Sequence, residues 1–278
     1  MDWPRITIVT PSYNQGRFLE FTICSVIGQA YPNLEYIVVD GGSTDNSVDI
    51  IQRYAEFLAF WVSEPDNGAA HAINKGFARA SGEILAWLNS DDIYEPDTLL
   101  DVAQIFRQDE SVTVVFGDCY MVDETGHILD TFNAEDESFH RKLQFWRGWR
   151  IPQPTVFVRR SVWEEVGPLD ESLCYAFDYE WFLRIAKKHR FVHLGRVMAR
   201  YRLHTASKSG TDWELSRRRF YPECFQVSRR YWGTWPQIRY WQYRGGYLLS
   251  PLRRQVGGWK ANITRWWRMR LPKHRDQE

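Results

Sequence analysis

Two adjacent carboxylates stand in the segment WLNSDDIYEP, where Asp91 and Asp92 follow a short apolar run. Neighbouring carboxylates repel one another, and a hard divalent cation such as Mg²⁺ or Mn²⁺ relieves that repulsion through oxygen ligands. Such a cation usually keeps coordination sites open for substrate phosphates. The structural alternative is that the acidic pair favours the N-terminus of the helix predicted near Pro96. The flanking residues favour a metal-assisted site over a plain helix start.

Two further carboxylates follow apolar runs in the same way. Asp40 comes after YIVV, and Asp66 lies in SEPDNG. Each could accept a hydrogen bond from a nucleotide base or a ribose hydroxyl, or could instead satisfy the backbone of its own turn. The chain has no GxGxxG after the first apolar run and no GxxxxGK[ST] anywhere. A dinucleotide oxidoreductase and a P-loop NTPase are therefore disfavoured, and carboxylates with a metal would hold any diphosphate.

The elements that position these groups alternate between strand and helix. Short apolar, β-branched runs predict strands at residues 6–10, 34–39, 60–63 and 84–88, and a helical pattern follows each of them. This alternation predicts an α/β fold with a mostly parallel central sheet flanked by helices. Ligands of such sheets bind beyond the carboxyl ends of the strands. The polar clusters that end all four strands are therefore expected to form one crevice.

The second half of the chain is less regular. Strands are predicted at residues 112–117, 128–132 and 155–158, and an amphipathic helix at residues 178–188. Asp178 opens that helix, where it can cap the helix and can also take a proton from a substrate hydroxyl. Gln153 either lines an acceptor pocket or lies in a turn. Trp146 and Trp149 are either core residues or stacking surfaces for sugar rings.

Charge is distributed unevenly along the 278 residues. The whole chain has 35 Lys+Arg and 35 Asp+Glu, yet residues 213–278 hold 15 basic and 4 acidic residues, together with seven of the 14 Trp. This asymmetry predicts a folded, acidic body over residues 1–212 and a basic, aromatic extension over residues 213–278. Gly and Pro residues divide the extension into several short helices.

Three interpretations of the extension remain open. The first is docking on an anionic membrane surface, with Arg attracted to lipid headgroups and Trp and Tyr seated among them. In a helix, Trp259, Ile263, Trp266 and Trp267 share one face. The second is packing of the aromatic residues on the acidic body. The third, binding of single-stranded nucleic acid, is the least favoured, and we expect no nucleic-acid partner.

Other sequence features indicate where the protein works. No run approaches the roughly 18 apolar residues of a membrane-spanning helix, and MDWPRITIVTPSYN does not have the pattern of a signal peptide. Four cysteines without a CxxC pair indicate reduced core thiols rather than a disulfide framework or a zinc site. We expect a cytoplasmic protein, held peripherally on the inner face of the cytoplasmic membrane.

The first 210 or so residues resemble the inverting family 2 glycosyltransferases, which have the nucleotide-diphospho-sugar transferase (GT-A) fold. The resemblance lies in TPSYNQGRFLEFTICSVIGQAYPNLEYIVVDGGSTDNS, SEPDNGAAHAINKGFARASGEILAWLNSDD and GPLDESLCYAFDYEWFLRIA. Several motifs occur in the family's order and spacing. The resemblance is specific for the family, but it does not identify the substrate.

The resemblance implies roles at matching positions. Residues implied to hold the base and ribose of a nucleotide sugar are Pro11, Tyr13, Asp40 and Asp66. Asp91 would bind the ribose or the metal, and Asp92 and His204 would bind the metal. Asp178 matches the catalytic aspartate, although Phe177 replaces the preceding glutamate, which leaves Glu180 as the alternative base. His71 stands where many relatives have Asp or Arg.

These expectations combine into one function. The chain is expected to be an inverting, Mn²⁺- or Mg²⁺-dependent glycosyltransferase that moves a sugar from a nucleotide-diphosphate donor to a hydroxyl of a saccharide acceptor, lipid-linked or part of a surface polysaccharide. One general base at Asp178 is consistent with single displacement, and a Lewis acid would stabilise the leaving diphosphate. The alternatives are a sugar nucleotidyltransferase and a non-catalytic scaffold that binds nucleotide sugars.

Overall fold

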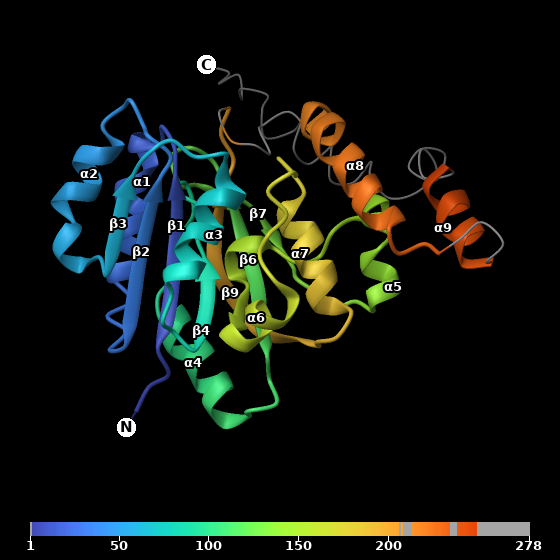
Figure 1. Cartoon of the computed structure of the whole chain (residues 1–278), viewed down its shortest axis with the longest axis horizontal. Coiled ribbons are helices and arrows are strands. Elements are labelled where there is room, and N and C mark those ends of the chain that lie inside the picture. The colour runs from blue at the N-terminus through green and yellow to red at the C-terminus, as the bar shows by residue number, and fades with distance from the viewer. Residues whose placement is uncertain (1, 206, 208–212, 234–237, 249–278) are drawn as a thin grey trace, which may run out of the picture.

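The structure, a computed structural model, describes residues 2–205, 207, 213–233 and 238–248. Over these residues a nine-stranded mixed sheet lies between two layers of helices (Figure 1). The strands are β1 (Ile6–Ser12), β2 (Leu34–Asp40), β3 (Phe60–Ser63), β4 (Ile84–Trp87), β5 (Ile93–Tyr94), β6 (Val114–Val122), β7 (Ile128–Phe132), β8 (Phe157–Arg159) and β9 (Phe191–Arg202). Their order is β3-β2-β1-β4-β8-β6-β9-β5, with β7 paired to β6.

The first half of the sheet has the predicted alternation. Strands β1 to β4 are parallel, and the helices between them are α1 (Gly16–Ile27), α2 (Ser47–Arg53) and α3 (Ala69–Arg79). The register places Ser12 opposite Asp40, and Asp40 opposite Ser63. The carboxyl ends of β1, β2 and β3 therefore meet at one edge of the sheet.

The second half is mixed rather than mostly parallel. Strand β8 is antiparallel to both β4 and β6, so β6 and its parallel neighbour β9 run in the same direction as β1 to β4. β5 and β7 run in the opposite direction. The helices here are α4 (Thr98–Gln108), α5 (Phe139–Lys142), α6 (Arg160–Val166) and α7 (Phe177–Ala186). Because β9 points the same way as β1, its carboxyl end reaches the same edge.

Strand β9 was not predicted from the sequence. Its segment FVHLGRVMARYR interrupts the apolar residues with charged residues and a glycine, which obscures the period of a strand. The strand is held by parallel pairing along β6 and by antiparallel pairing with β5. It forms because of pairing partners distant in sequence rather than because of its own propensity.

Two apolar clusters fill the space on the two faces of the sheet. Helices α1, α2 and α4 pack on one face through residues such as Leu19, Ile51 and Val102. Helices α3, α6 and α7 cover the other face. There the Trp87 ring stacks on Phe182, with centroids 5.9 Å apart, and meets Trp181 edge to face at 5.6 Å.

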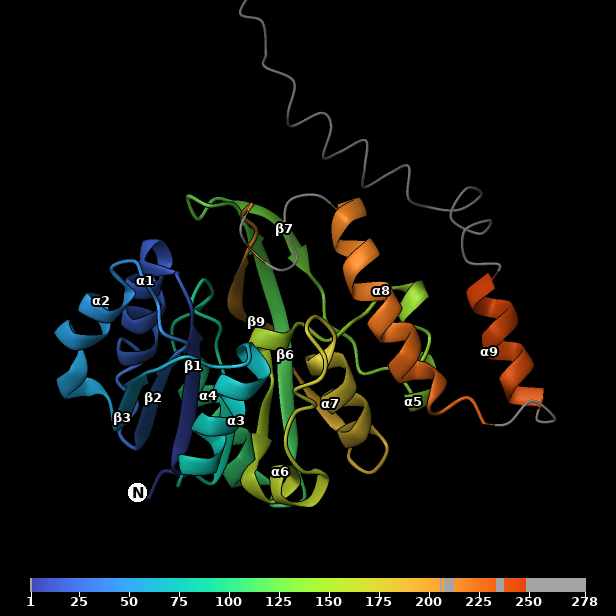
Figure 2. The same cartoon turned by 45° about the horizontal axis from the view of Figure 1, so that its top comes forward.

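The described part of the C-terminal extension packs on the body. Helices α8 (Trp213–Arg229) and α9 (Ile238–Leu248) lie on the α7 side of the molecule (Figure 2). Four buried side chains of this region belong to the same apolar cluster as α7. They are Cys224 and Val227 of α8, Trp232 shortly after α8, and Tyr243 of α9. Trp146 is also a core residue, 6.0 Å from Trp232. Residues 249–278, with Trp259, Ile263, Trp266 and Trp267, lie outside the described residues.

Two further expectations, about the cysteines and about membrane-spanning helices, can be compared with the structure. Cys119 and Cys224 are buried free thiols, as expected, whereas Cys24 and Cys174 are exposed, so the expectation of four core thiols is wrong for these two. Each helix placed in the structure is too short or too polar to cross a bilayer.

Candidate active site

The carboxyl ends of β1, β2 and β3 form the first part of the site around Asp40. This side chain is fully buried, and its Oδ2 accepts hydrogen bonds from the backbone N–H of Gly42 (3.1 Å) and Ser43 (2.8 Å) and from Ser63 Oγ (2.7 Å). Ser43 Oγ donates to its Oδ1 at 2.5 Å. Asp40 therefore fixes the loop after β2, and the turn role considered for it from sequence is present.

Asp66 lies directly over that loop. A Cβ added at Gly41 would come within 2.7 Å of Asp66 Oδ2, so a side chain at this position would have to displace the carboxylate. Asp66 Oδ1 accepts the N–H of Gly68 at 2.7 Å, which holds the carboxylate at the start of α3. Asp40 and Asp66 are thus adjacent although they follow different strands.

The loop after β1 belongs to the same part of the site. Pro11 is buried in β1, and Tyr13 extends from the edge with 61% of its surface exposed. Asn14 has a φ of 52° and binds the neighbouring loop, accepting the Thr44 N–H and donating its own N–H to Ser43 Oγ, both at 2.8 Å. These contacts place Pro11 and Tyr13 beside the Asp40 loop.

The acidic pair after β4 meets the end of β9. Nε2 of His204 lies 2.9 Å from Oδ2 of Asp91, and the imidazole, 2% exposed, packs against the Phe18 ring at 4.7 Å. Asp91 is partly exposed. A carboxylate oxygen and an imidazole nitrogen side by side are a suitable ligand pair for a divalent metal.

Asp92 occupies a different position. Its side chain is fully buried, with Oδ1 accepting the Arg202 N–H at 2.9 Å and Oδ2 accepting from Asn89 Nδ2 at 3.3 Å. Burial and the neighbouring charge of Asp91 raise the pKa of Asp92 well above its usual range. Thr22 Oγ1 of α1 donates to its backbone carbonyl at 2.8 Å. Asp92 therefore ties the loop after β4 to the end of β9.

Two polar side chains support this loop: Gln153, for which the sequence left an acceptor pocket and a turn open, and Arg202, which the sequence did not assign to the site. Gln153 donates through Nε2 to the Trp87 carbonyl at 2.9 Å and accepts from Asn89 Nδ2 through Oε1, also at 2.9 Å. The guanidinium of Arg202 donates to the Asp91 carbonyl at 2.9 Å. Asn89, two residues before the acidic pair, is a sequence signal for a polar side chain in this loop. Arg202 has no such signal, because only the pairing of β9 brings it to the loop.

Asp178 lies at the N-terminal end of α7, in the layer of helices. Only four residues separate the end of α7 from the start of β9, so the C-terminus of α7 lies where β9 begins and its N-terminus faces the edge where β9 ends (Figure 1). Asp178 lies in the first turn of α7, is partly exposed, and accepts the Tyr179 N–H at 2.7 Å. Helix α7 packs on the same face of the sheet as α3 and α6.

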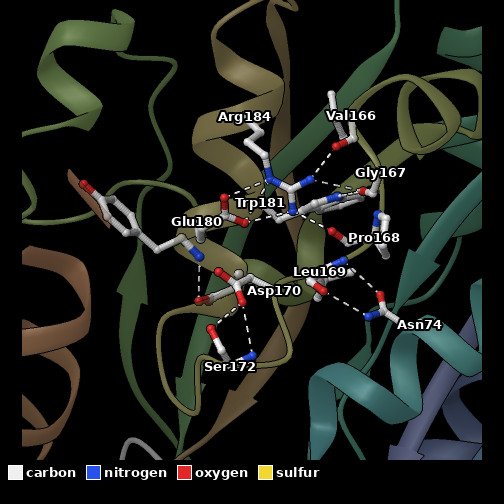
Figure 3. A network of polar contacts seen from close by, with 12 residues as sticks. Asn74, Val166, Gly167, Pro168, Leu169, Asp170, Ser172, Glu180, Trp181 and Arg184 are labelled. Atoms are coloured by element: carbon white, nitrogen blue, oxygen red, sulfur yellow. Dashed lines mark hydrogen bonds and ion pairs between the residues drawn. The ribbon is translucent and has the colours of Figure 1, made fainter. Parts of the chain in front are cut away.

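Glu180, the alternative base, is engaged in a structural network (Figure 3). Its carboxylate is 4% exposed and accepts from Nε of Arg184 at 2.9 and 3.0 Å. The same guanidinium donates to the carbonyls of Val166 and Pro168. Trp181 Nε1 donates to the Gly167 carbonyl at 3.0 Å. Glu180 is therefore part of the contacts that fix the loop before α7.

That loop is also fixed from α3. Nδ2 of Asn74 donates to the Leu169 carbonyl at 3.0 Å, and the Leu169 N–H donates back to Asn74 Oδ1 at 2.9 Å (Figure 3). His71, also on α3, accepts the Asn67 N–H at 3.1 Å through Nδ1. His71 thus lies beside the Asp66 turn, at the start of α3.

Two side chains at this edge, Asp91 and His204, have donor atoms of the kind that bind a divalent metal. Within the described ranges, no three His, Cys, Asp or Glu side chains form a cluster able to hold a metal. Asp91 and His204 provide two donors of suitable type, which fits a cation that takes its remaining ligands from water and substrate phosphates. Two open cavities of about 330 and 520 Å³ share Glu83 and Arg159 and lie at the opposite edge, where β4 begins.

Sequence comparisons give a consistent family for this arrangement. The sequence model of Glycosyl transferase family 2 matches residues 7–167. TuaG of Bacillus subtilis, a putative teichuronic acid biosynthesis glycosyltransferase, is 30% identical over 223 residues, covering 78% of this chain and 86% of TuaG. An uncharacterized glycosyltransferase of Rickettsia typhi is 28% identical over 216 residues, covering 75% of this chain and 67% of the relative.

Solved structures share the fold. The mannosyltransferase PcManGT from Pyrobaculum calidifontis, in complex with GDP-Man and Mn²⁺, has a TM-score of 0.61 at 20% identity, over 97% of this chain and 80% of its own. S. aureus TarS 1-349 in complex with UDP-GlcNAc has a TM-score of 0.61 at 19% identity, over 73% of this chain and 60% of its own. At these identities the comparison establishes the fold and not the ligand.

Proposed function

This chain belongs to Glycosyl transferase family 2, and we propose that it transfers a sugar from a nucleotide-diphosphate donor to a hydroxyl group of a saccharide acceptor with inversion at the anomeric carbon. The observation that supports this most directly is that Asp40, Asp66 and the Asp91–His204 pair end or follow strands whose carboxyl ends lie at one edge of the sheet. The N-terminal end of α7, with Asp178 in its first turn, faces that edge (Figure 1). Solved proteins of this fold hold GDP-Man or UDP-GlcNAc.

The donor nucleotide binds at the ends of β1 and β2 in this proposal. Tyr13 presents an exposed ring on which a base can stack. Asp66 provides a partly exposed carboxylate for a base N–H or a ribose hydroxyl. Asp40 is already saturated by Ser43, Gly42 and Ser63, so a direct bond to the base replaces one of these contacts. Pro11 sets the position of Tyr13 from within β1.

The diphosphate binds beside the Asp91–His204 pair. These two residues would hold Mn²⁺ or Mg²⁺, and a bound cation supplies Lewis-acid stabilisation of the leaving diphosphate. The metal role of Asp92 stays a prediction, because its buried carboxylate already accepts from Arg202 and Asn89. Its described contacts support a role in holding the loop that presents Asp91.

Asp178 is the base in this proposal. Direct displacement needs one group that takes the proton of the acceptor hydroxyl as its oxygen attacks the anomeric carbon. A retaining double displacement would need a separate nucleophile as well. Glu180 is the weaker candidate because its buried carboxylate is paired with the guanidinium of Arg184. The proton passes from the acceptor oxygen to the carboxylate of Asp178, and the C–O bond to the diphosphate breaks.

The acceptor is a lipid-linked or surface saccharide, and the protein works at the inner face of the cytoplasmic membrane. TuaG is named for teichuronic acid biosynthesis, which supports a cell-surface polymer. On α9, the exposed Ile238, Trp241 and Leu248 share one side of the helix, and the Arg244 guanidinium lies 5.4 Å from the Trp241 ring centroid. Apolar, aromatic and basic side chains together suit an anionic lipid surface.

A thermal-shift screen of nucleoside diphosphates and nucleotide sugars, with and without Mn²⁺, tests the proposal. A bound donor stabilises the native state, so one nucleotide series should raise Tm more than the others. Release of the nucleoside diphosphate from that donor then shows turnover. Stabilisation without any release would favour the scaffold, and release of pyrophosphate from a nucleoside triphosphate and a sugar phosphate would favour the nucleotidyltransferase.

Vesicle sedimentation tests the membrane proposal. Vesicles with anionic lipid should bind the protein, and binding should weaken as salt rises because surface charges are screened. Trp241→Glu should reduce this binding, whereas Phe57→Glu, which changes an aromatic residue exposed elsewhere, should not. Equal binding of all three proteins would exclude α9 as the lipid contact.

A further inference from the structure

Helix α8 binds the backbone immediately before α7. Glu223 accepts three consecutive N–H groups, from Cys174 at 3.0 Å through Oε1 and from Tyr175 at 2.7 Å and Ala176 at 2.8 Å through Oε2. Hydrogen bonds to a carboxylate are among the stronger ones in proteins, and a negative charge is favourable at a helix N-terminus. Ala176 directly precedes α7, and Asp178 follows two residues later.

A second contact, made by the residue that directly follows α8, ties this segment to the same region. Arg230 Nη1 lies 3.4 Å from Asp170 Oδ2 and 3.9 Å from Glu180 Oε1. Arg230 follows Glu223 by seven residues, or about two helical turns, so both side chains leave the same side of this stretch. Between them, Cys224 and Val227 are fully buried in the cluster that also contains α7. The contacts of Glu223 are therefore made from a firmly packed segment.

The contacts of Glu223 fix the backbone that sets the direction of Asp178. Residues 174–176 link the Val166–Ser172 loop to the first turn of α7, and the N–H groups of this link donate to Glu223. Loss of that acceptor would let the first turn of α7 shift. A displacement of about 1 Å in a reacting group can lower a rate by about 100-fold.

We propose that Glu223 is a positioning residue for Asp178, and that α8 thereby completes the transfer site. Helix α8 lies beyond the span that the family sequence model matches, residues 7–167. The inference rests on the proposed role of Asp178 as the base. It assigns to the C-terminal segment a part in the reaction, separate from its proposed contact with lipid.

The experiment compares Glu223→Ala, Glu223→Gln and Gln226→Ala in the full chain. Gln226 is an exposed residue of α8 and serves as the matched control. Hydrogen exchange of the amides at 174–176 measures whether their hydrogen bonds to residue 223 persist. The affinity for the donor found in the thermal-shift screen, and kcat with that donor, measure whether the transfer site still works. Glu223→Ala should speed exchange at these amides and lower kcat at least tenfold, with donor affinity within about twofold of the wild type. Glu223→Gln keeps one acceptor oxygen and should recover part of kcat.

The outcomes separate this inference from the proposed function. If the wild type turns over and Asp178→Asn does not, but Glu223→Ala keeps full kcat despite faster exchange at 174–176, the positioning role is wrong. Unchanged exchange at these amides would also overturn it. If the wild type releases no nucleoside diphosphate, the proposed function fails instead. If Asp178→Asn remains fully active, the base lies elsewhere and the positioning role of Glu223 fails with it. Should Glu223→Ala not fold, Glu223→Gln supplies the same comparison.

Discussion

Nε2 of His204 lies 2.9 Å from Oδ2 of Asp91, a contact between residues 113 positions apart in the chain. β9 brings the two together, because its parallel pairing with β6 delivers its carboxyl end to the edge where β4 also ends. The neighbouring Asp92 accepts the N–H of Arg202, the last residue of β9. The two carboxylates therefore have different roles: Asp91 contacts His204, and Asp92 holds the end of β9, the strand that precedes His204.

From these different contacts we predict that Asp91 and His204, rather than Asp92, set the requirement for Mn²⁺. Asp91→Asn and His204→Ala should each raise the Mn²⁺ concentration needed for half-maximal nucleoside diphosphate release by at least about tenfold, while EDTA should abolish release from the wild type. Asp49→Asn, an exposed carboxylate of α2, is the control and should behave as the wild type. A changed Mn²⁺ requirement in Asp92→Asn but not in Asp91→Asn would return the ligand role to Asp92.

Asp178→Asn should keep donor binding and lose transfer. The amide is nearly the same size as the carboxylate but cannot take the proton of the acceptor hydroxyl, and a general base contributes roughly 10² to 10⁴ in rate. Single-turnover kinetics with the identified donor measure the rate of the transfer step, and the thermal shift measures binding. Full activity of this variant would place the base elsewhere.

The ion pair between Glu180 and Arg184 should support the fold rather than the chemistry. Glu180→Gln should lower the free energy of unfolding by about 2 kcal/mol, somewhat less than for a fully buried pair because Arg184 is partly exposed. Urea denaturation measures this change. Lys188→Gln breaks an exposed pair with Glu165 and should cost less than about 1 kcal/mol. Equal losses in the two variants would contradict the structural role.

Glu35 should make stability sensitive to acid. Burial disfavours its charge, but hydrogen bonds from Ser81 and Thr7 outweigh burial and hold the pKa of Glu35 below its usual value. A folded-state pKa below the unfolded value gives stability that is present above the ordinary glutamate pKa of about 4.3 and is lost as pH falls further, through the folded-state pKa.

Glu35→Gln tests this dependence. The variant should unfold more easily than the wild type near pH 7, and the difference in Tm should shrink as the pH is lowered below about 4.3. Glu110→Gln, an exposed glutamate in the turn after α4, should show no such difference. If the difference in Tm between Glu35→Gln and the wild type stays constant as the pH falls below about 4.3, Glu35 is not a source of acid sensitivity.

The order of elements in the first half was predictable from sequence because each element there is a local pattern. Apolar runs and polar loop residues between residues 6 and 88 repeat with the periods of strand and helix, and the structure has β1 to β4 and α1 to α3 where they were predicted. The C-terminal half was less predictable, since β9 is an interrupted run that depends on distant partners.

The sequence alone determined which residues could do the chemistry and which family the chain resembles, because motif spacing is a local property that survives without coordinates. Only the tertiary structure decided how those residues are used. It gave Asp91 rather than Asp92 to His204, paired Glu180 with Arg184, and brought Glu223 of α8 to the backbone before Asp178. The contacts of His204 with Asp91 and of Glu223 with the backbone before α7 join residues 113 and 47–49 positions apart, which no local pattern records, and the burial of Glu180 depends on the packing around α7.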